Sequence, residues 1–260
     1  MTRIIGIALV RNEDIWIERA LLNALPLCDE LLVADNGSTD GTPAILARLA
    51  AAHPQIKVRS IAHPRESAQM IAGYAGTPTW IFGVDGDEIY DPVGLARMRV
   101  ALLEGRYDEW WVVFGNVLNC TDISFDHKTA TGYLAPPCRS MTKLYNFQML
   151  ERTDPDARQR LHSTGDVFRA GFSTELRLNL HEQTPWEAAD FRCLHACFVP
   201  RSSLDSKSGA RRNVSESLGL LNRARVFIAR LFGRSAESDY KLEKYRRGKI
   251  VTVDAADFLK

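Results

Sequence analysis

Three carboxylates stand within four residues at Asp85–Glu88, whose sequence is Asp-Gly-Asp-Glu. The apolar run Trp80–Val84 comes directly before them, so they emerge from the end of a predicted buried strand. Crowded carboxylates repel one another, and a divalent cation removes that repulsion because hard cations prefer oxygen ligands and often bridge to substrate phosphates. Asp-x-Asp alone is a weak pattern, but its place after a strand indicates a metal and phosphate site.

A second polar cluster follows another predicted strand, which ends at Asp35. The Asn-Gly dipeptide after it favours a tight turn because both residues tolerate a positive φ, and Asp40 or Thr42 then caps a helix. A well-formed turn is one interpretation of this cluster. The other is a binding loop, since an acidic side chain at a strand end suits hydrogen bonds to a nucleobase N–H or to ribose hydroxyls.

The elements that must position these clusters alternate over residues 1–117. Apolar segments predict strands at 4–10, 30–35, 56–61, 79–84 and 110–117, with helices near 13–25, 42–53, 65–76 and 92–104. Strands that are apolar throughout and separated by helices predict an α/β fold with a mostly parallel sheet covered on both faces. Ligands bind beyond the carboxyl ends of such strands, and both acidic clusters lie there.

The pattern changes after residue 117. Residues 118–140 show no clear periodicity and residues 151–165 are polar, which is typical of functional loops. Strand-like segments return at 143–147, 175–180 and 191–199. From about Ser202 the sequence is helical in pattern and basic. We therefore predict one domain over residues 1–200 and a basic helical extension over residues 201–260.

The composition is that of a globular protein, with 45% hydrophobic residues, 25% charged residues and a net charge of +1. Five cysteines at irregular spacing favour reduced thiols. No apolar run approaches the roughly 20 residues of a membrane span, and the first residues are typical of a strand rather than an export signal. These features predict a cytoplasmic protein.

The charge is unevenly distributed, since residues 201–260 hold 14 Lys and Arg against 7 Asp and Glu. One face of a predicted helix in this extension is mostly apolar and includes Leu218, Leu221, Ile228 and Phe232. Such a helix either docks on the protein core or lies on an anionic membrane, so peripheral membrane contact stays open. Nucleic acid is not predicted as a partner, because aromatic residues do not interleave with the basic ones.

Four stretches in order resemble the family 2 glycosyltransferases, which have the GT-A fold of nucleotide-diphospho-sugar transferases. These stretches are Val10–Glu13, Asp35–Thr42, Val84–Glu88, and Leu180–Glu182 followed by His195. The resemblance covers roughly residues 4–200 and includes the His-Glu signature of a branch close to lipopolysaccharide-core transferases. It implies a hexosyltransferase that moves a sugar from a nucleotide-diphosphate donor, with a UDP-sugar favoured, to a glycan or lipid-linked glycan hydroxyl. It further implies an inverting reaction in cell-envelope glycan synthesis.

The resemblance also implies a role for individual residues. The donor-binding residues are Val10, Asn12, Glu13, Asp35, Asp85 and Gly86. The ligands of a divalent cation, Mn²⁺ or Mg²⁺, are Asp87 with Asp85 and His195, and an imidazole ligand tilts the choice toward Mn²⁺. Glu182 would be the general base, and His181 would orient the acceptor or Glu182.

The chain departs from the family before the fourth strand, where many relatives carry Arg-Asn and this chain has Gln69 and Met70. Arg65, one turn upstream, is the candidate for the missing contact to phosphate or base. The other assignments also have alternatives. Glu182 could be a plain surface carboxylate, with Asp190 as another possible base, and His181 could be structural.

His195 has two alternative interpretations. It alternates with Cys193 and Cys197, which would place all three side chains on one face of a strand. They would then be part of a structural zinc site, or His195 would be a plain core residue.

For the whole chain, one rival function is nucleotidyl transfer on the same fold, which usually needs a glycine-rich loop after the first strand. The other rival is non-catalytic binding of a sugar nucleotide or glycan.

Overall fold

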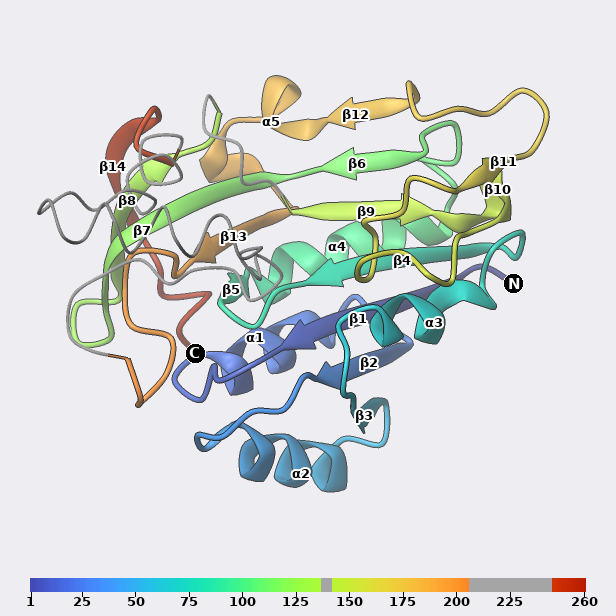
Figure 1. Ribbon diagram of the computed structural model, residues 1–260. Coiled ribbons are helices and arrows are strands. Elements are labelled where there is room, and N and C mark those ends of the chain that lie inside the picture. Colours follow the sequence, from blue (N-terminus) through green and yellow to red (C-terminus); the bar gives the residue numbers. More distant parts are fainter. Residues whose placement is uncertain (137–141, 206–244) are drawn as a thin grey trace, which may run out of the picture.

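A seven-stranded sheet forms the centre of the computed structural model, which describes residues 1–136, 142–205 and 245–260 (Figure 1). The strand order is β12-β6-β9-β4-β1-β2-β3. The strands are β1 (Arg3–Val10), β2 (Glu30–Asp35), β3 (Ile56–Ser60), β4 (Thr79–Val84), β6 (Val112–Phe114), β9 (Lys143–Asn146) and β12 (Arg177–Asn179). Only β9 runs antiparallel to its neighbours in this sheet, which confirms the predicted mostly parallel α/β fold.

Helices cover both faces of this sheet, as predicted. They are α1 (Ile17–Ala24), α2 (Thr42–Ala52), α3 (Glu66–Ala72) and α4 (Pro92–Leu103). Successive residues of β1 point to opposite faces. Ile4 belongs to the core cluster that contains Leu21 of α1 and Leu95 of α4, whereas Ile5 belongs to the cluster that contains Ile71 of α3. The apolar residues of the central strands are therefore buried on both sides.

A second sheet of five strands, in the order β14-β8-β7-β13-β5, continues from the first. Its strands are β5 (Glu88–Tyr90), β7 (Asn116–Ser124), β8 (Thr129–Leu134), β13 (Arg192–His195) and β14 (Lys249–Asp254). The chain passes from β6 to β7 through Gly115, where a Cβ atom would lie 2.3 Å from the carbonyl oxygen of Phe191. Only glycine permits this close approach of two backbones.

Short elements complete the described chain. Strands β10 (Leu150–Arg152) and β11 (Val167–Phe168) pair antiparallel, and α5 (Leu180–Gln183) follows β12. Short 3-10 helices cover Phe147–Met149 and Trp186–Ala188.

The structure corrects the sequence prediction in two regions. Residues 118–140, for which no elements are predicted, contain most of the hairpin of β7 and β8. Strand β7 shows no alternation because its first half is buried on both faces and its second half is largely open to solvent. The predicted helical extension is wrong for residues 249–254, which form β14 and pair antiparallel with β8. The β-branched residues of β14 suit this edge strand.

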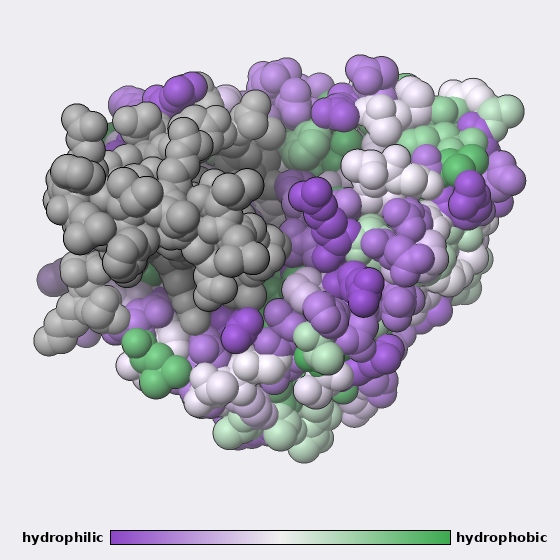
Figure 2. Space-filling view, in the orientation of Figure 1, coloured by the Kyte–Doolittle hydropathy of each residue, from purple (hydrophilic) through white to green (hydrophobic). Residues whose placement is uncertain are grey.

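The amphipathic segment at residues 218–234 lies outside the described ranges, so the two alternatives for it, docking on the core and contact with a membrane, both stay open. The last residues pack on the second sheet, where Phe258 and Leu259 share a buried cluster with Trp16 and Trp186. Of the helices that the structure describes, none is long and apolar enough to cross a bilayer. Hydrophilic residues predominate among the coloured atoms in Figure 2, with apolar residues in small patches.

Candidate functional site

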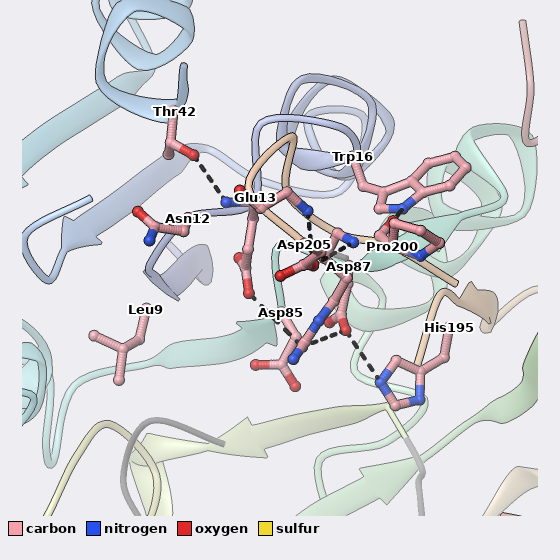
Figure 3. Close-up of polar contacts among 12 residues, drawn as sticks. Leu9, Asn12, Glu13, Trp16, Thr42, Asp85, Asp87, His195, Pro200 and Asp205 are labelled. Carbon is pink, nitrogen blue, oxygen red and sulfur yellow. Dashed lines mark hydrogen bonds and ion pairs between the residues drawn. The ribbon is translucent and has the colours of Figure 1, made fainter. Parts of the chain in front are cut away.

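The loops after β1 and β2 are joined by hydrogen bonds at the carboxyl ends of these two parallel neighbours. The backbone N–H of Asn12 donates to Ser38 Oγ at 2.9 Å, and Asn12 Oδ1 accepts from the backbone N–H of Thr39 at 2.6 Å. The backbone N–H of Glu13 donates to Thr42 Oγ1 at 2.9 Å (Figure 3). The two motifs therefore form one unit at the edge of the sheet.

Asp35, predicted to contact a nucleobase, is buried at the end of β2 and pairs in register with Val10. Its Oδ1 accepts hydrogen bonds from the backbone N–H and the hydroxyl of Ser38, at 3.0 and 2.6 Å. One carboxylate oxygen is thus committed to the turn. Asp35 and Val10 both lie at the strand ends where the sequence analysis predicts them, next to the two joined loops.

The acidic cluster after β4 consists of one exposed and two buried carboxylates. The Asp85 side chain is 55% exposed, whereas Asp87 and Glu88 are buried. Glu88 accepts a hydrogen bond from the Tyr90 hydroxyl. A Cβ atom at Gly86 would lie 1.9 Å from Glu13 Oε2, so the absence of a side chain lets Glu13 pack against this cluster.

The second sheet brings His195 to the acidic cluster. Strand β13 pairs antiparallel with β5 so that His195 lies opposite Glu88, and His195 Nε2 lies 3.5 Å from Asp87 Oδ2 (Figure 3). The other ring nitrogen, Nδ1, lies 2.8 Å from Asn119 Oδ1. Because an amide oxygen only accepts hydrogen bonds, Nδ1 carries a proton, and Nε2 is the ring nitrogen that faces Asp87.

Arg201 completes this group, and neither its position nor its role is predicted from the sequence. Its Nη1 lies 2.6 Å from Asp87 Oδ2 and 3.9 Å from Glu13 Oε1. Burial disfavours the ionised form of Asp87, but Arg201 and His195 outweigh burial and hold the pKa of Asp87 below its ordinary value. Burial likewise opposes the charged form of His195, while Cys197 and Asp87 raise the pKa of His195.

Two further carboxyls of the site have raised pKa values. Burial, followed by the negative charge of Asp87, raises the pKa of Glu13 to about 8. Burial, followed by the charge of Asp85, raises the pKa of Glu88 to about 7. In both carboxyls burial is the larger cause of the raised pKa, and a neighbouring carboxylate adds to it.

Arg160 is a second buried arginine that the sequence analysis does not predict. Its Nη1 donates to the carbonyl oxygen of Leu9 at 3.3 Å, and its Nη2 donates to that of Val84 at 2.9 Å. Its Nη2 also pairs with Asp85. Arg160 thereby joins the ends of β1 and β4 and holds Asp85, the residue predicted to face ribose or metal. It lies within the polar stretch 151–165, where no local pattern marks it as buried.

The predicted catalytic pair lies further along the same edge of the sheet. Helix α5 follows β12, which runs in the same direction as β4 and lies three strand positions away, or about 14 Å at the usual strand spacing. The Glu182 side chain is 65% exposed, and its Oε1 accepts from Asn179 Nδ2 at 3.0 Å. His181 Nε2 lies 3.9 Å from the same oxygen, and burial lowers the pKa of His181.

Asp190, the other candidate base, and Arg65, the candidate contact to phosphate or base, have surroundings different from those of Glu182. Asp190 Oδ1 accepts from Arg97 Nε at 2.7 Å and is therefore engaged by α4. Arg65 is exposed directly before α3. The structure thus leaves Glu182 as the more accessible of the two candidate bases.

Asp87 and His195 are the side chains that suit a divalent cation. The separation of 3.5 Å between their facing atoms fits two ligands of one ion at about 2.1 Å each. Within the residues that the structure describes, no three His, Cys, Asp or Glu side chains form a group that could hold an ion, and this includes Cys193 and Cys197. A divalent cation at this pair would need its remaining ligands from water or substrate oxygens, such as those of a diphosphate.

The sequence profile of glycosyl transferase family 2 matches residues 7–163. This range contains the loops after β1 and β2 and the acidic cluster after β4. It ends before α5 and β13. No curated protein matches the chain.

Several solved structures are similar to the chain at low sequence identity. A mannosyltransferase from Pyrobaculum calidifontis, in complex with GDP-Man and Mn²⁺, is 17% identical with a TM-score of 0.42; the match covers 77% of this chain and 58% of that protein. Glucosyl-3-phosphoglycerate synthase from Mycobacterium tuberculosis, in complex with Mn²⁺, UDP and glucosyl-3-phosphoglycerate, is 19% identical with a TM-score of 0.37, over 57% of this chain and 58% of the synthase. A mycobacterial protein is 15% identical with a TM-score of 0.41, over 91% of this chain and 76% of its own. The chain therefore spans less than two thirds of the first two proteins.

Proposed function

The chain belongs to glycosyltransferase family 2, and we propose that it transfers a hexose from a nucleotide-diphosphate sugar, with a UDP-sugar favoured, to an acceptor hydroxyl with inversion. The acceptor is a glycan or lipid-linked glycan of the cell envelope, and the donor is used in the cytoplasm. The observation that supports this function best is the meeting of Asp87 and His195 beside the loops after β1 and β2. A nucleoside diphosphate needs both a wall for its nucleoside and a cation for its phosphates, and this edge of the sheet offers residues for each.

The loops after β1 and β2 form the wall of the nucleoside pocket. Their donor-binding residues are Val10, Asn12, Glu13 and Asp35. The hydrogen bonds between the two loops fix these residues before the donor binds. This preorganisation lowers the entropic cost of binding the donor. Asp85 and Gly86 approach the ribose, and Arg65 remains the predicted contact to the base or phosphate.

Asp87 and His195, with Asp85 beside them, would hold Mn²⁺ or Mg²⁺. When bound, the cation offsets the negative charge that develops on the departing diphosphate. Glu182 takes the proton of the acceptor hydroxyl while that oxygen attacks the anomeric carbon, and the bond from this carbon to the phosphate oxygen breaks. Burial lowers the pKa of His181, so its ring is neutral, and it lies beside Glu182 to orient the acceptor or Glu182.

Release of nucleoside diphosphate from a panel of UDP-, GDP- and dTDP-sugars tests this function, with glycan acceptors and with Mn²⁺ or Mg²⁺. We expect one donor to be turned over, and we expect Asp87→Ala to remove that turnover. Glu104→Gln, at an exposed carboxylate after α4, is the matched control and should keep full activity. Nucleoside diphosphates that raise the melting temperature without any turnover would indicate a binding protein instead.

A further inference from the structure

Arg201 lies on the carboxylate oxygen that a cation in the proposed site would use. Asp87 Oδ2 is 2.6 Å from Arg201 Nη1 and 3.5 Å from His195 Nε2. The Arg201 side chain is only 12% exposed, so water screens this contact weakly. A guanidinium and a divalent cation cannot both occupy this side of Asp87 Oδ2. A cation can therefore bind this oxygen only if the Arg201 side chain moves.

The backbone of Arg201 is held independently of its contact with Asp87. The carbonyl oxygen of Arg201 accepts from the backbone N–H of Ile15 at 3.2 Å, and that of Pro200 accepts from Trp16 Nε1 at 2.8 Å (Figure 3). The backbone N–H of Arg201 donates to Asp205 Oδ2 at 3.0 Å. The guanidinium can thus change partners by side-chain rotation while its backbone stays in place.

The residues that follow Arg201 attach to the same loops that form the nucleoside wall. Ser202 Oγ donates to Asp40 Oδ2 at 2.6 Å, and the backbone N–H of Ser203 donates to Asp14 Oδ1 at 2.7 Å. Asp14 and Asp40 belong to the loops after β1 and β2. This attachment keeps the Arg201 side chain at the mouth of the donor site whichever partner it has.

Two buried polar atoms lie beside the Arg201 contact and could each form a hydrogen bond with a ligand. Arg201 Nε and Glu13 Oε2 are both buried, and neither has a hydrogen-bond partner within the described residues. A buried donor without an acceptor is costly, and native structures rarely keep one unless a ligand or water supplies the partner. A phosphate oxygen is an acceptor that suits a guanidinium N–H.

We propose that Arg201 and the divalent cation compete for Asp87 Oδ2, and that Arg201 binds the donor's diphosphate once the cation holds that oxygen. This inference rests on the proposed function and adds a diphosphate-binding residue to it. It has a consequence for affinity that a purely structural ion pair does not have. Removal of Arg201 should strengthen binding of the cation alone and weaken binding of the nucleoside diphosphate.

The test compares Arg201→Met with wild type and with Arg48→Met, a matched control at an exposed arginine of α2 that pairs with Glu18. Binding of Mn²⁺ alone is measured from the EPR signal of free Mn²⁺. Binding of UDP, of GDP and of dTDP is measured by calorimetry at saturating Mn²⁺. We expect Arg201→Met to bind Mn²⁺ about tenfold more tightly and the nucleoside diphosphate about tenfold more weakly, as for one charge-assisted contact in each case. Arg48→Met should match wild type in both.

An unchanged or weaker Mn²⁺ affinity of Arg201→Met would overturn the inference, and so would an unchanged affinity for the nucleoside diphosphate. If Arg201→Met does not fold, Arg201→Gln gives the same comparison, because it keeps hydrogen-bond donors near Asp87 without the charge. A wild type that binds none of UDP, GDP and dTDP with Mn²⁺ would count against the proposed function itself. A wild type that binds one of them, beside an unaffected Arg201→Met, would count against the role of Arg201 alone.

Discussion

Asp91 and Arg192 form a buried ion pair that links the end of β5 to the start of β13. Asp91 Oδ2 accepts from Arg192 Nε at 3.1 Å and from Nη2 at 2.8 Å, and the two side chains are 2% and 15% exposed. Asp91 Oδ1 also caps α4, since it accepts from the backbone N–H groups of Val93 and Gly94, each at 3.0 Å. Because His195 lies on β13, this pair helps to fix the position of His195 beside the acidic cluster.

Asp91→Ala should be strongly destabilising. Loss of the helix cap costs about 1 kcal/mol. Removal of one partner of a buried ion pair costs about 3–5 kcal/mol, and the lower end applies because Arg192 Nη1 keeps its bond to the Trp186 carbonyl oxygen. We therefore expect the free energy of unfolding to fall by about 4 kcal/mol and the melting temperature to fall by about 10 °C.

Urea unfolding followed by circular dichroism measures this loss. Asp91→Asn is the matched variant, since asparagine keeps the cap but loses the ion pair, and it should lose about 3 kcal/mol. The double variant Asp91→Ala, Arg192→Met should be less destabilised than the sum of its single variants, because it leaves no unpaired charge. A loss below about 1 kcal/mol in Asp91→Ala would refute the argument that this pair is buried and coupled.

Three further predictions concern the site. Asn119→Leu removes the hydrogen-bond acceptor that orients His195. It should weaken Mn²⁺ binding in the presence of UDP by about 10–100-fold, as measured by calorimetry. An unchanged Mn²⁺ affinity would exclude this orienting role. Glu182→Gln should lower kcat by about 10²–10⁴-fold with little change in the donor KM, and normal turnover would favour a plain surface carboxylate. The pKa of Glu13, about 8 in the folded protein, lies above its ordinary value of 4.5, so the folded state binds the extra proton between these pH values and stability falls as pH rises. Glu13→Gln should therefore gain stability relative to wild type between pH 5 and pH 8, as measured by urea unfolding, and an equal difference at both pH values would contradict this.

The central strands and the loops at their ends could be predicted because their signals are local. Strands β1, β2 and β4 are continuous apolar runs, and the structure places each within one residue of its predicted bounds. Polar residues that directly follow parallel neighbours must meet at one edge of a sheet. The meeting of Asn12 with the turn after Asp35 follows from this rule.

The second sheet could not be predicted, because its pairings join distant segments without local markers. The position of His195 depends on the register of β13 against β5, which no periodicity in either strand reveals. Arg160 and Arg201 reach Asp85 and Asp87 from 75 and 114 residues away. The local sequence does not distinguish a buried arginine from a solvated one, so only the folded structure shows which of them is buried.

The central claim is that Asp87 and His195 together hold the cation of a nucleotide-sugar donor. Pulsed EPR of the protein with Mn²⁺ and UDP tests it most directly, because a coordinated imidazole couples its nitrogen nucleus to the Mn²⁺ electrons. We predict a directly coordinated ¹⁴N signal in wild type that disappears in His195→Gln, together with loss of bound Mn²⁺ in Asp87→Ala. A wild-type complex without nitrogen coupling, or a coupling that persists in His195→Gln, would contradict the account.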